Sequence, residues 1–141
     1  MNRLKGKNIV ITGATSGIGK ASAFLFAEMG THLFLTGRRV DRLQQIKHEI
    51  EKEYTGSKVS VFNFDVSDYD ECKHFVNQLP SQIDVLLNNA GLALGTDAIF
   101  DLKKEDADQM IAVNINGVLS LTRLISPKMK QNNSGHIINL C

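Results

Sequence analysis

The chain of 141 residues is long enough for one domain, and 43% of its residues are hydrophobic, which suffices for a packed core. Its net charge is +1 with acids and bases mixed along the chain, so we expect neither a nucleic-acid partner nor a membrane partner. No apolar run approaches the ~20 residues that span a bilayer. Two cysteines and four scattered histidines form neither a disulfide framework nor a metal-ligand pattern, so we expect a cytoplasmic protein without a metal.

A glycine-rich turn between an apolar run and a helical segment organises the start of the chain. Residues 9–11 are predicted to form a strand, and the pattern Thr12-Gly13-x-x-x-Gly17-x-Gly19 follows directly. The first glycine permits a tight turn, the second a close approach to a pyrophosphate, and the third the packing of the new helix on its strand. Free N–H groups at the helix start then favour phosphate. An ordinary glycine-rich loop is the alternative, because three glycines alone are a weak signal.

Apolar runs and helical patterns alternate along the rest of the chain. Further strands are predicted at residues 32–36, 58–64, 83–87 and 136–140, with a loop at 91–100. Apolar residues at helical spacing predict four helices between the strands. The rows are Ile18, Ala21, Leu25 and Met29; Leu43, Ile46, Ile50 and Tyr54; Cys72, Phe75, Val76 and Leu79; and Ala107, Met110, Ile111, Asn114, Val118, Leu121, Ile125 and Met129.

Local signals mark where the last two helices begin and end. Either Ser67 or Asp68 is expected to cap the third helix. Glu105 and Asp106 favour the start of the long fourth helix, and Pro127 is expected to bend it near its end.

Five apolar strands separated by helices predict an α/β fold, namely a doubly wound parallel sheet of the Rossmann type. The expected strand order is 3-2-1-4-5, with right-handed crossovers and helices on both faces. A ligand should then bind at the carboxyl ends of the strands, where the order reverses between the first and the fourth. We see no repeat or linker and expect residues 1–141 to form one domain.

The residues after the second predicted strand indicate the coenzyme. A coenzyme with a free ribose 2′-OH is usually held by an Asp or Glu about 20 residues beyond the glycine turn. Here the sequence is Thr36-Gly37-Arg38-Arg39, which has two guanidinium groups and no carboxylate. Arg can hold a 2′-phosphate through paired hydrogen bonds. We therefore expect NADP(H) rather than NAD(H), with a solvated surface pair as the alternative.

Polar residues also follow the third and fourth strands. The Asp65 carboxylate can accept from an adenine amino group beside the Val66 backbone, or it can cap the next helix. In Asn88-Asn89-Ala90-Gly91, the glycine allows a turn under a flat coenzyme, and the amides can bind ribose, bind backbone or form an Asx turn. These alternatives stay open from the residues alone.

Asn114 is a polar residue in the middle of an apolar helix face. A buried amide needs hydrogen-bond partners. It could hold an internal water at an active site, or it could brace the helix against the sheet, and the sequence slightly favours bracing.

Together these signals resemble the short-chain dehydrogenase/reductase family along the whole chain. The resemblance rests on five ordered motifs: Thr12-Gly13-x-x-x-Gly17-x-Gly19, Asp65-Val66, Asn88-Asn89-Ala90-Gly91, Asn114-x-x-Gly117 and Gly135-His136-Ile137-Ile138-Asn139. Residues 88–95 with 36–39 resemble the NADP-dependent branch that oxidises L-allo-threonine, serine and related 3-hydroxy acids.

The resemblance implies an oxidoreductase that transfers a hydride between NADP(H) and a small hydroxy or keto substrate. It implies that Asn114 holds a water in the proton relay of a catalytic tetrad. The coenzyme-binding residues that it implies are Gly13, Ala14, Thr15, Ser16, Gly17, Ile18, Gly19, Arg38, Arg39, Asp65, Val66, Asn89, Ala90 and Gly91.

The chain departs from the family at its end. The family has a tetrad Ser just after the fifth strand, about where this chain reaches Cys141, and a Tyr-x-x-x-Lys pair further on. Tyr54 and Tyr69 come too early and are not expected to supply that pair. We therefore expect an N-terminal part of a longer single-domain reductase, truncated after the fifth strand, which binds coenzyme without turnover. An apolar fifth strand at an open edge agrees with this expectation.

Two other functions compete with this one. A 3-oxoacyl carrier-protein reductase is the alternative within the enzyme class, and an inert nucleotide-binding module is the alternative outside it. The full-length protein is expected to be a homo-oligomer.

Overall fold

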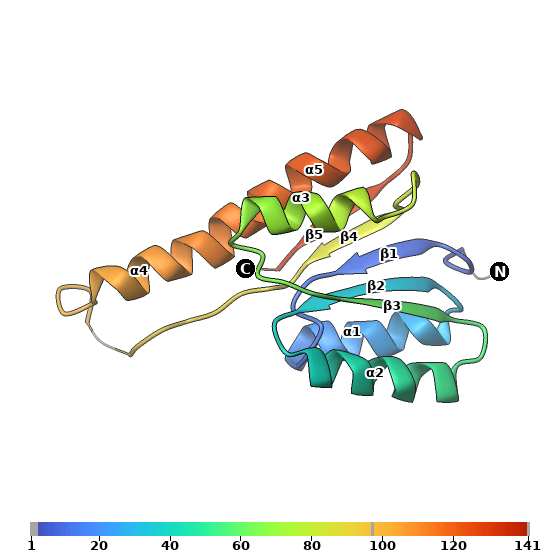
Figure 1. Cartoon of the computed structure of the whole chain (residues 1–141), viewed down its shortest axis with the longest axis horizontal. Coiled ribbons are helices and arrows are strands. Elements are labelled where there is room, and N and C mark those ends of the chain that lie inside the picture. Colours follow the sequence, from blue (N-terminus) through green and yellow to red (C-terminus); the bar gives the residue numbers. More distant parts are fainter. Residues whose placement is uncertain (1–2, 97, 141) are drawn as a thin grey trace.

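The computed structural model describes residues 3–96 and 98–140, so Cys141 and position 97 of the expected loop lie outside it. Helices and strands alternate along the chain as the sequence predicts (Figure 1). The elements are β1 (Asn8–Ile11), α1 (Gly17–Glu28), β2 (His32–Gly37), α2 (Val40–Glu53), β3 (Lys58–Asn63), α3 (Tyr69–Asn77), β4 (Val85–Asn88), α4 (Lys104–Ile111), the π-helix η1 (Ala112–Gly117), α5 (Val118–Gln131) and β5 (His136–Asn139).

The five strands form one parallel sheet in the order β3-β2-β1-β4-β5, which confirms the predicted topology. β1 lies in the centre, pairing Ile9 with Leu33 of β2 on one side and with Val85 of β4 on the other. Among the described residues, β5 pairs only with β4. The carboxyl ends of β1, β2 and β4 therefore lie together at one edge, on either side of the point where the strand order reverses.

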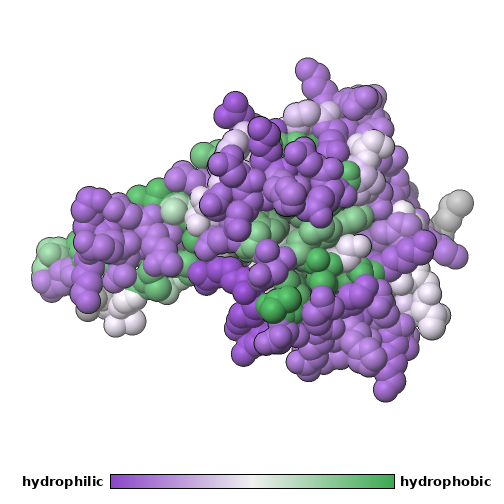
Figure 2. Space-filling model, viewed as in Figure 1, coloured by the Kyte–Doolittle hydropathy of each residue, from purple (hydrophilic) through white to green (hydrophobic). Residues whose placement is uncertain are grey.

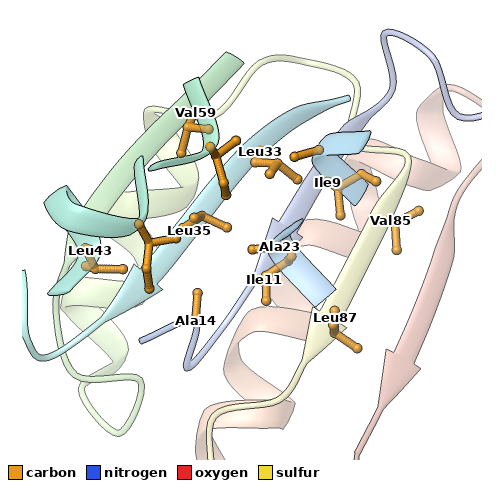
Figure 3. Close-up of a cluster of buried hydrophobic side chains, with 13 residues drawn as sticks. Ile9, Ile11, Ala14, Ala23, Leu33, Leu35, Leu43, Val59, Val85 and Leu87 are labelled. Carbon is orange, nitrogen blue, oxygen red and sulfur yellow. The ribbon is translucent and has the colours of Figure 1, made fainter. Parts of the chain in front are cut away.

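Helices cover both faces of the sheet, and each face has its own hydrophobic core (Figure 1). On one face, α1 and α2 pack over side chains of β1, β2 and β4, as Figure 3 shows for residues that include Ile9, Leu33 and Val85. On the other face, α3 and α5 pack over the alternate side chains, which include Val10 and Leu86. This alternation is what a strand buried on both faces requires.

The apolar row predicted for α1 is wrong as a packing face. Ile18 is 64% exposed and Leu25 is 55% exposed, whereas the buried residues of the helix are Gly19, Ala23 and Ala27. Small side chains bring the helix axis close to the sheet, which leaves no room there for the larger residues of the predicted row.

The rows predicted for α2 and α3 are confirmed. Leu43, Ile46 and Ile50 are buried under α2, and the row Cys72, Phe75, Val76 and Leu79 is buried under α3 or just beyond its end. The cap of α3 is Asp68, whose side chain accepts from the backbone N–H of Glu71 at 2.9 Å.

The long helix expected after residue 104 is not one continuous α-helix. The six residues of η1 form a π-helical stretch between α4 and α5. The buried row passes through Val113 and Gly117 and continues as predicted at Leu121, Ile125 and Met129. The prediction that Ile111 and Asn114 face inward is wrong, because both are exposed.

The surface of the molecule is mostly hydrophilic over α2 and α3, with a hydrophobic band between them along the edge strand β3 (Figure 2). Within residues 3–96 and 98–140, no helix is both long enough and apolar enough to cross a membrane.

Candidate functional site

A pocket of about 760 Å³ opens at the carboxyl ends of the strands, where the topology predicts a ligand. Its walls come from the glycine-rich turn, the end of β2, the segment after β3 and the segment after β4. The lining residues are Gly13, Thr15, Ser16, Gly17, Ile18, Thr36, Gly37, Arg38, Arg39, Phe64, Asp65, Val66, Asn89, Ala90, Gly91, Leu92 and Val113.

Twelve of the fourteen coenzyme-binding residues expected from the sequence line this pocket, and Ala14 and Gly19 do not. Ala14 is fully buried beneath the turn, and its N–H donates to the Thr36 carbonyl at 3.0 Å. Gly19 is buried at the start of α1. These two residues shape the turn from below, and Asn114, the expected catalytic residue, also lies outside the lining.

Two glycines of the turn are required by their surroundings. Gly13 has a φ of +63°, and a Cβ there would lie 2.8 Å from the Cα of Ala90. A Cβ on Gly19 would lie 2.4 Å from the Gly13 carbonyl oxygen. Larger residues are excluded at both positions, and the space in front of the α1 N-terminus stays open. An open cradle of backbone N–H groups at a helix start fits a pyrophosphate.

Hydrogen bonds join the glycine-rich turn to the end of β4. The Thr12 hydroxyl accepts from the backbone N–H groups of Asn89 and Ala90 at 3.0 and 2.8 Å. The Asn89 side-chain amide donates back to the carbonyls of Thr12 and Gly13 at 2.9 and 3.0 Å. These bonds fix the floor of the pocket, because both segments lose the freedom to move apart.

The two arginines after β2 contact different parts of the pocket wall. Arg39 donates from Nε and Nη2 to the Thr15 hydroxyl at 3.2 and 2.6 Å, and from Nη2 to the Ser16 hydroxyl at 2.9 Å. The Nη1 of Arg38 lies 3.8 Å from the Asp65 carboxylate. Both guanidinium groups are exposed, so the pocket carries positive charge next to the turn.

Asp65 does not cap α3, because Asp68 is the cap, so the capping alternative is wrong. Its Oδ1 accepts from the backbone N–H and the hydroxyl of Ser67 at 2.9 and 2.7 Å, which forms an Asx turn. The other oxygen faces Arg38. The carboxylate is therefore fixed at the pocket wall beside Val66.

The amide of Asn114 braces the segment after β4. Its Oδ1 accepts from the Leu92 N–H at 2.9 Å, and its Nδ2 donates to the Leu92 carbonyl at 2.8 Å. Nearby, a Cβ on Gly117 would lie 2.9 Å from Cγ2 of Val66, so the glycine lets η1 approach the segment after β3. The π-helical segment thus holds two walls of the pocket in place.

Asn88 supports the site from below. The residue is 2% exposed, and its amide donates to the Thr122 hydroxyl at 3.1 Å and to the Asn139 side chain at 2.9 Å. Asn88 therefore joins β4 to α5 and β5, and it lies outside the pocket lining.

Sequence reasoning missed several residues of the pocket. Thr36 and Gly37 stand directly before the predicted arginines, and Phe64 and Leu92 directly flank other predicted residues, so the neighbourhood was a usable signal. Val113 directly precedes the predicted Asn114, but its inward direction depends on η1, which the sequence did not predict.

Tyr54 and Tyr69 each have a lysine four residues later, Lys58 and Lys73, so the Tyr-x-x-x-Lys spacing alone does not exclude them from the tetrad. None of the four lines the pocket. Tyr54 follows the end of α2, and a hydrogen bond to Glu53 raises its pKa, whereas a general acid/base near neutral pH needs a lowered one. The two pairs are therefore unsuited to the tetrad role.

Comparison with known proteins finds relatives that match nearly the whole chain. The NADP-dependent 3-hydroxy acid dehydrogenase of Schizosaccharomyces pombe is 44% identical over 144 residues, which cover 99% of this chain and 55% of that protein. The NADP-dependent 3-hydroxy acid dehydrogenase YdfG of Escherichia coli K12 is 36% identical over 135 residues, which cover 94% and 52%. The chain spans about half the length of the curated relatives it matches.

Solved structures agree as well. Serine dehydrogenase from Escherichia coli superposes with a TM-score of 0.82 at 36% identity, over 93% of this chain and 60% of that one. A metagenomic short-chain oxidoreductase in complex with NADP superposes with a TM-score of 0.90 at 33% identity, over 96% and 61%. Residues 7–141 match the family described as short chain dehydrogenase, and the chain belongs to that family.

Proposed function

We propose that this protein transfers a hydride between NADP(H) and a 3-hydroxy acid or a related hydroxy or keto compound. Relatives at 36% and 44% identity are named NADP-dependent 3-hydroxy acid dehydrogenases, which supports the substrate class. The observation that carries the coenzyme is the position of Arg38 and Arg39 in the pocket wall at the end of β2. A 2′-phosphate needs cationic donors at that place, and an NAD-binding site has a carboxylate there.

Each wall of the pocket has a part in this proposal. The N–H groups at the start of α1 hold the pyrophosphate, and the two arginines hold the 2′-phosphate. Asp65 and Val66 bind adenine, and Asn89 contacts a ribose of the coenzyme, with Ala90 and Gly91 beside it. NADP supplies the hydride acceptor or donor, while the residues of this chain bind and orient it.

Acid–base chemistry is proposed to come from residues outside this pocket lining. Both the oxygen and the nitrogen of the Asn114 amide are hydrogen-bonded to the Leu92 backbone. We therefore propose that Asn114 positions a proton-relay water indirectly, by holding the segment after β4 in place. General acid–base catalysis is worth ~10²–10⁴-fold. The tyrosine that supplies it in the family and the serine that holds the substrate oxygen have no match among the residues that line this pocket. We therefore propose coenzyme binding without efficient turnover for these 141 residues, as a part of a longer reductase.

The coenzyme proposal is tested by isothermal titration calorimetry with NADP⁺ and NAD⁺. The wild type is expected to bind NADP⁺ more tightly, and the double variant Arg38→Asp with Arg39→Leu to prefer NAD⁺. Arg42→Asp is the matched control, because Arg42 is exposed on α2 and outside the pocket. An unchanged preference in the double variant contradicts the proposal.

The reaction is tested by following NADPH absorbance with serine, 3-hydroxypropionate and an acetoacetyl thioester as substrates. Turnover of the hydroxy acids by the full-length natural protein that contains these residues supports the proposal. Preference for the thioester favours a 3-oxoacyl reductase instead. Tight NADP⁺ binding with no turnover of any compound favours a nucleotide-binding module.

A further inference from the structure

Hydrogen bonds to the glycine-rich turn hold the guanidinium group of Arg39 in place. Three hydrogen bonds of 2.6 to 3.2 Å run from its Nε and Nη2 to the hydroxyls of Thr15 and Ser16. No ion pair between described residues includes Arg39, whereas Arg38 faces the Asp65 carboxylate. The hydrogen bonds of Arg39 therefore go to neutral hydroxyl groups, and no described carboxylate neutralises its positive charge.

Thr15 is itself fixed, so it can fix its partner. The residue is 7% exposed, and the preceding Ala14 N–H donates to the Thr36 carbonyl across the strand end. A Cβ on Gly37 would lie 2.7 Å from Cγ2 of Thr15, so the missing side chain at Gly37 makes the space that the threonine methyl fills. The methyl of Thr15 packs on β2, and its hydroxyl accepts both hydrogen bonds from Arg39.

We infer that Thr15 is a positioning residue that sets coenzyme selectivity by holding Arg39 ready for the 2′-phosphate. This inference rests on the proposed function. An exposed arginine loses much side-chain freedom when it binds a phosphate, and a preorganised one loses less. The benefit applies only to a ligand that Arg39 contacts, so Thr15 should affect NADP⁺ and leave NAD⁺ nearly unchanged.

The test is Thr15→Val, which keeps the methyl that packs on Gly37 and removes the hydroxyl. Calorimetry is expected to show NADP⁺ binding weakened by about tenfold and NAD⁺ binding changed by less than about twofold. Thr15→Ser restores the hydroxyl and is expected to recover most of the selectivity. Ser16→Ala removes one hydrogen bond of the three and is expected to have a smaller effect. Thr55→Val is the matched control, because Thr55 is exposed in the turn before β3.

A double-mutant cycle shows whether Thr15 acts through Arg39. In the Arg39→Met background, Thr15→Val is expected to cause no further change in the ratio of NADP⁺ to NAD⁺ affinity. A further loss in that background overturns the inference, because Thr15 then contacts the ligand directly. Equal weakening of both coenzymes, or no weakening, overturns it as well. Circular dichroism establishes that each variant is folded, and a variant that is unfolded is replaced by Thr15→Ala in the same cycle.

The outcomes separate this inference from the proposed function. A folded wild type that binds neither coenzyme overturns both. A wild type that prefers NADP⁺ together with a Thr15→Val variant of equal preference overturns the role of Thr15 alone.

Discussion

Single side chains between the glycine-rich turn and the end of β4 determine the shape of the pocket floor. Asn89 is the clearest case, since its amide donates to two backbone carbonyls that come from the turn. A carbonyl oxygen accepts hydrogen bonds and cannot donate one, so only a side chain with N–H donors suits this place. The same amide approaches Gly19 so closely that no larger residue fits there.

Asn89→Asp is expected to destabilise the fold and to weaken NADP⁺ binding. The carboxylate has no N–H group and would face the carbonyls of Thr12 and Gly13, which leaves them without donors at a cost of about 1–3 kcal/mol in the free energy of unfolding. Urea unfolding with and without coenzyme measures both effects. Asn116→Asp, at an exposed position of η1, makes the same chemical change and should alter neither quantity. Equal stability of the two variants would count against the bracing role.

At the scale of one element, η1 shows where sequence patterns stop being informative. A period of 3.6 residues predicts one buried row for the whole helix, and this is correct for Leu121 and Ile125, which lie in α5 after η1. The wide turn of η1 exposes Asn114 and turns Val113 inward. No local residue preference in the sequence predicts a π-helical turn at this place. The buried faces of α2 and α3 were predictable, because large apolar residues of these helices pack against large apolar residues of the sheet. The strand order followed from the alternation of strands and helices along the chain.

The α1 helix shows a second limit of pattern reading. Its large apolar residues, Ile18 and Leu25, were predicted to form the packing face, yet glycine and alanine pack on the sheet instead. Close approach between helix and strand depends on the distance that the glycine-rich turn imposes, which is a tertiary property. The location of the site was predictable from its motifs. The hydrogen-bond partners of Arg39 and Asn114 could be identified only from the structure.

Asn114→Ala is expected to loosen the segment after β4 while the rest of the sheet stays intact. The variant loses both hydrogen bonds to Leu92, so the Leu92 amide hydrogen should exchange with solvent faster. Hydrogen exchange followed by nuclear magnetic resonance measures this, with Asn116→Ala as the control. Unchanged protection of Leu92 would contradict the role that the structure gives to Asn114.

Asp84, just before β4, makes stability depend on acid pH. Burial alone raises its pKa, but the Asn8 N–H, the Lys7 ammonium at 2.9 Å and the Gln82 amide favour the carboxylate more, so its pKa is lowered. A lowered folded-state pKa adds stability above the unfolded value of about 3.9, and this stability is lost as pH falls through the folded value.

Asp84→Asn is therefore expected to cost about 2 kcal/mol at pH 7 and less at pH 3. Urea unfolding at several pH values gives the difference between wild type and variant. A difference that stays constant from pH 7 to pH 3 would be inconsistent with this assignment. Asp101→Asn, at an exposed loop position, is the control and should change stability little at any pH.

At the scale of the whole molecule, the sheet separates two hydrophobic cores, each covered by helices (Figure 1). The pocket lies at the carboxyl ends of the strands. Thr12, directly after the central strand, and Asn89, directly after β4, meet there although 77 positions separate them. The pocket therefore belongs to the complete sheet and to no single βα unit.

This long separation has a consequence for folding kinetics. Because contacts between residues far apart in sequence form slowly during folding, the pairing of β1 with β4 is expected to be late. The pocket floor can form only after these two strands have paired. NADP⁺ should therefore slow the unfolding of the finished protein and leave the refolding rate unaltered. Stopped-flow experiments in urea would show the coenzyme displacing the unfolding arm of the chevron alone, and faster refolding with NADP⁺ would mean that the floor assembles earlier than its connectivity implies.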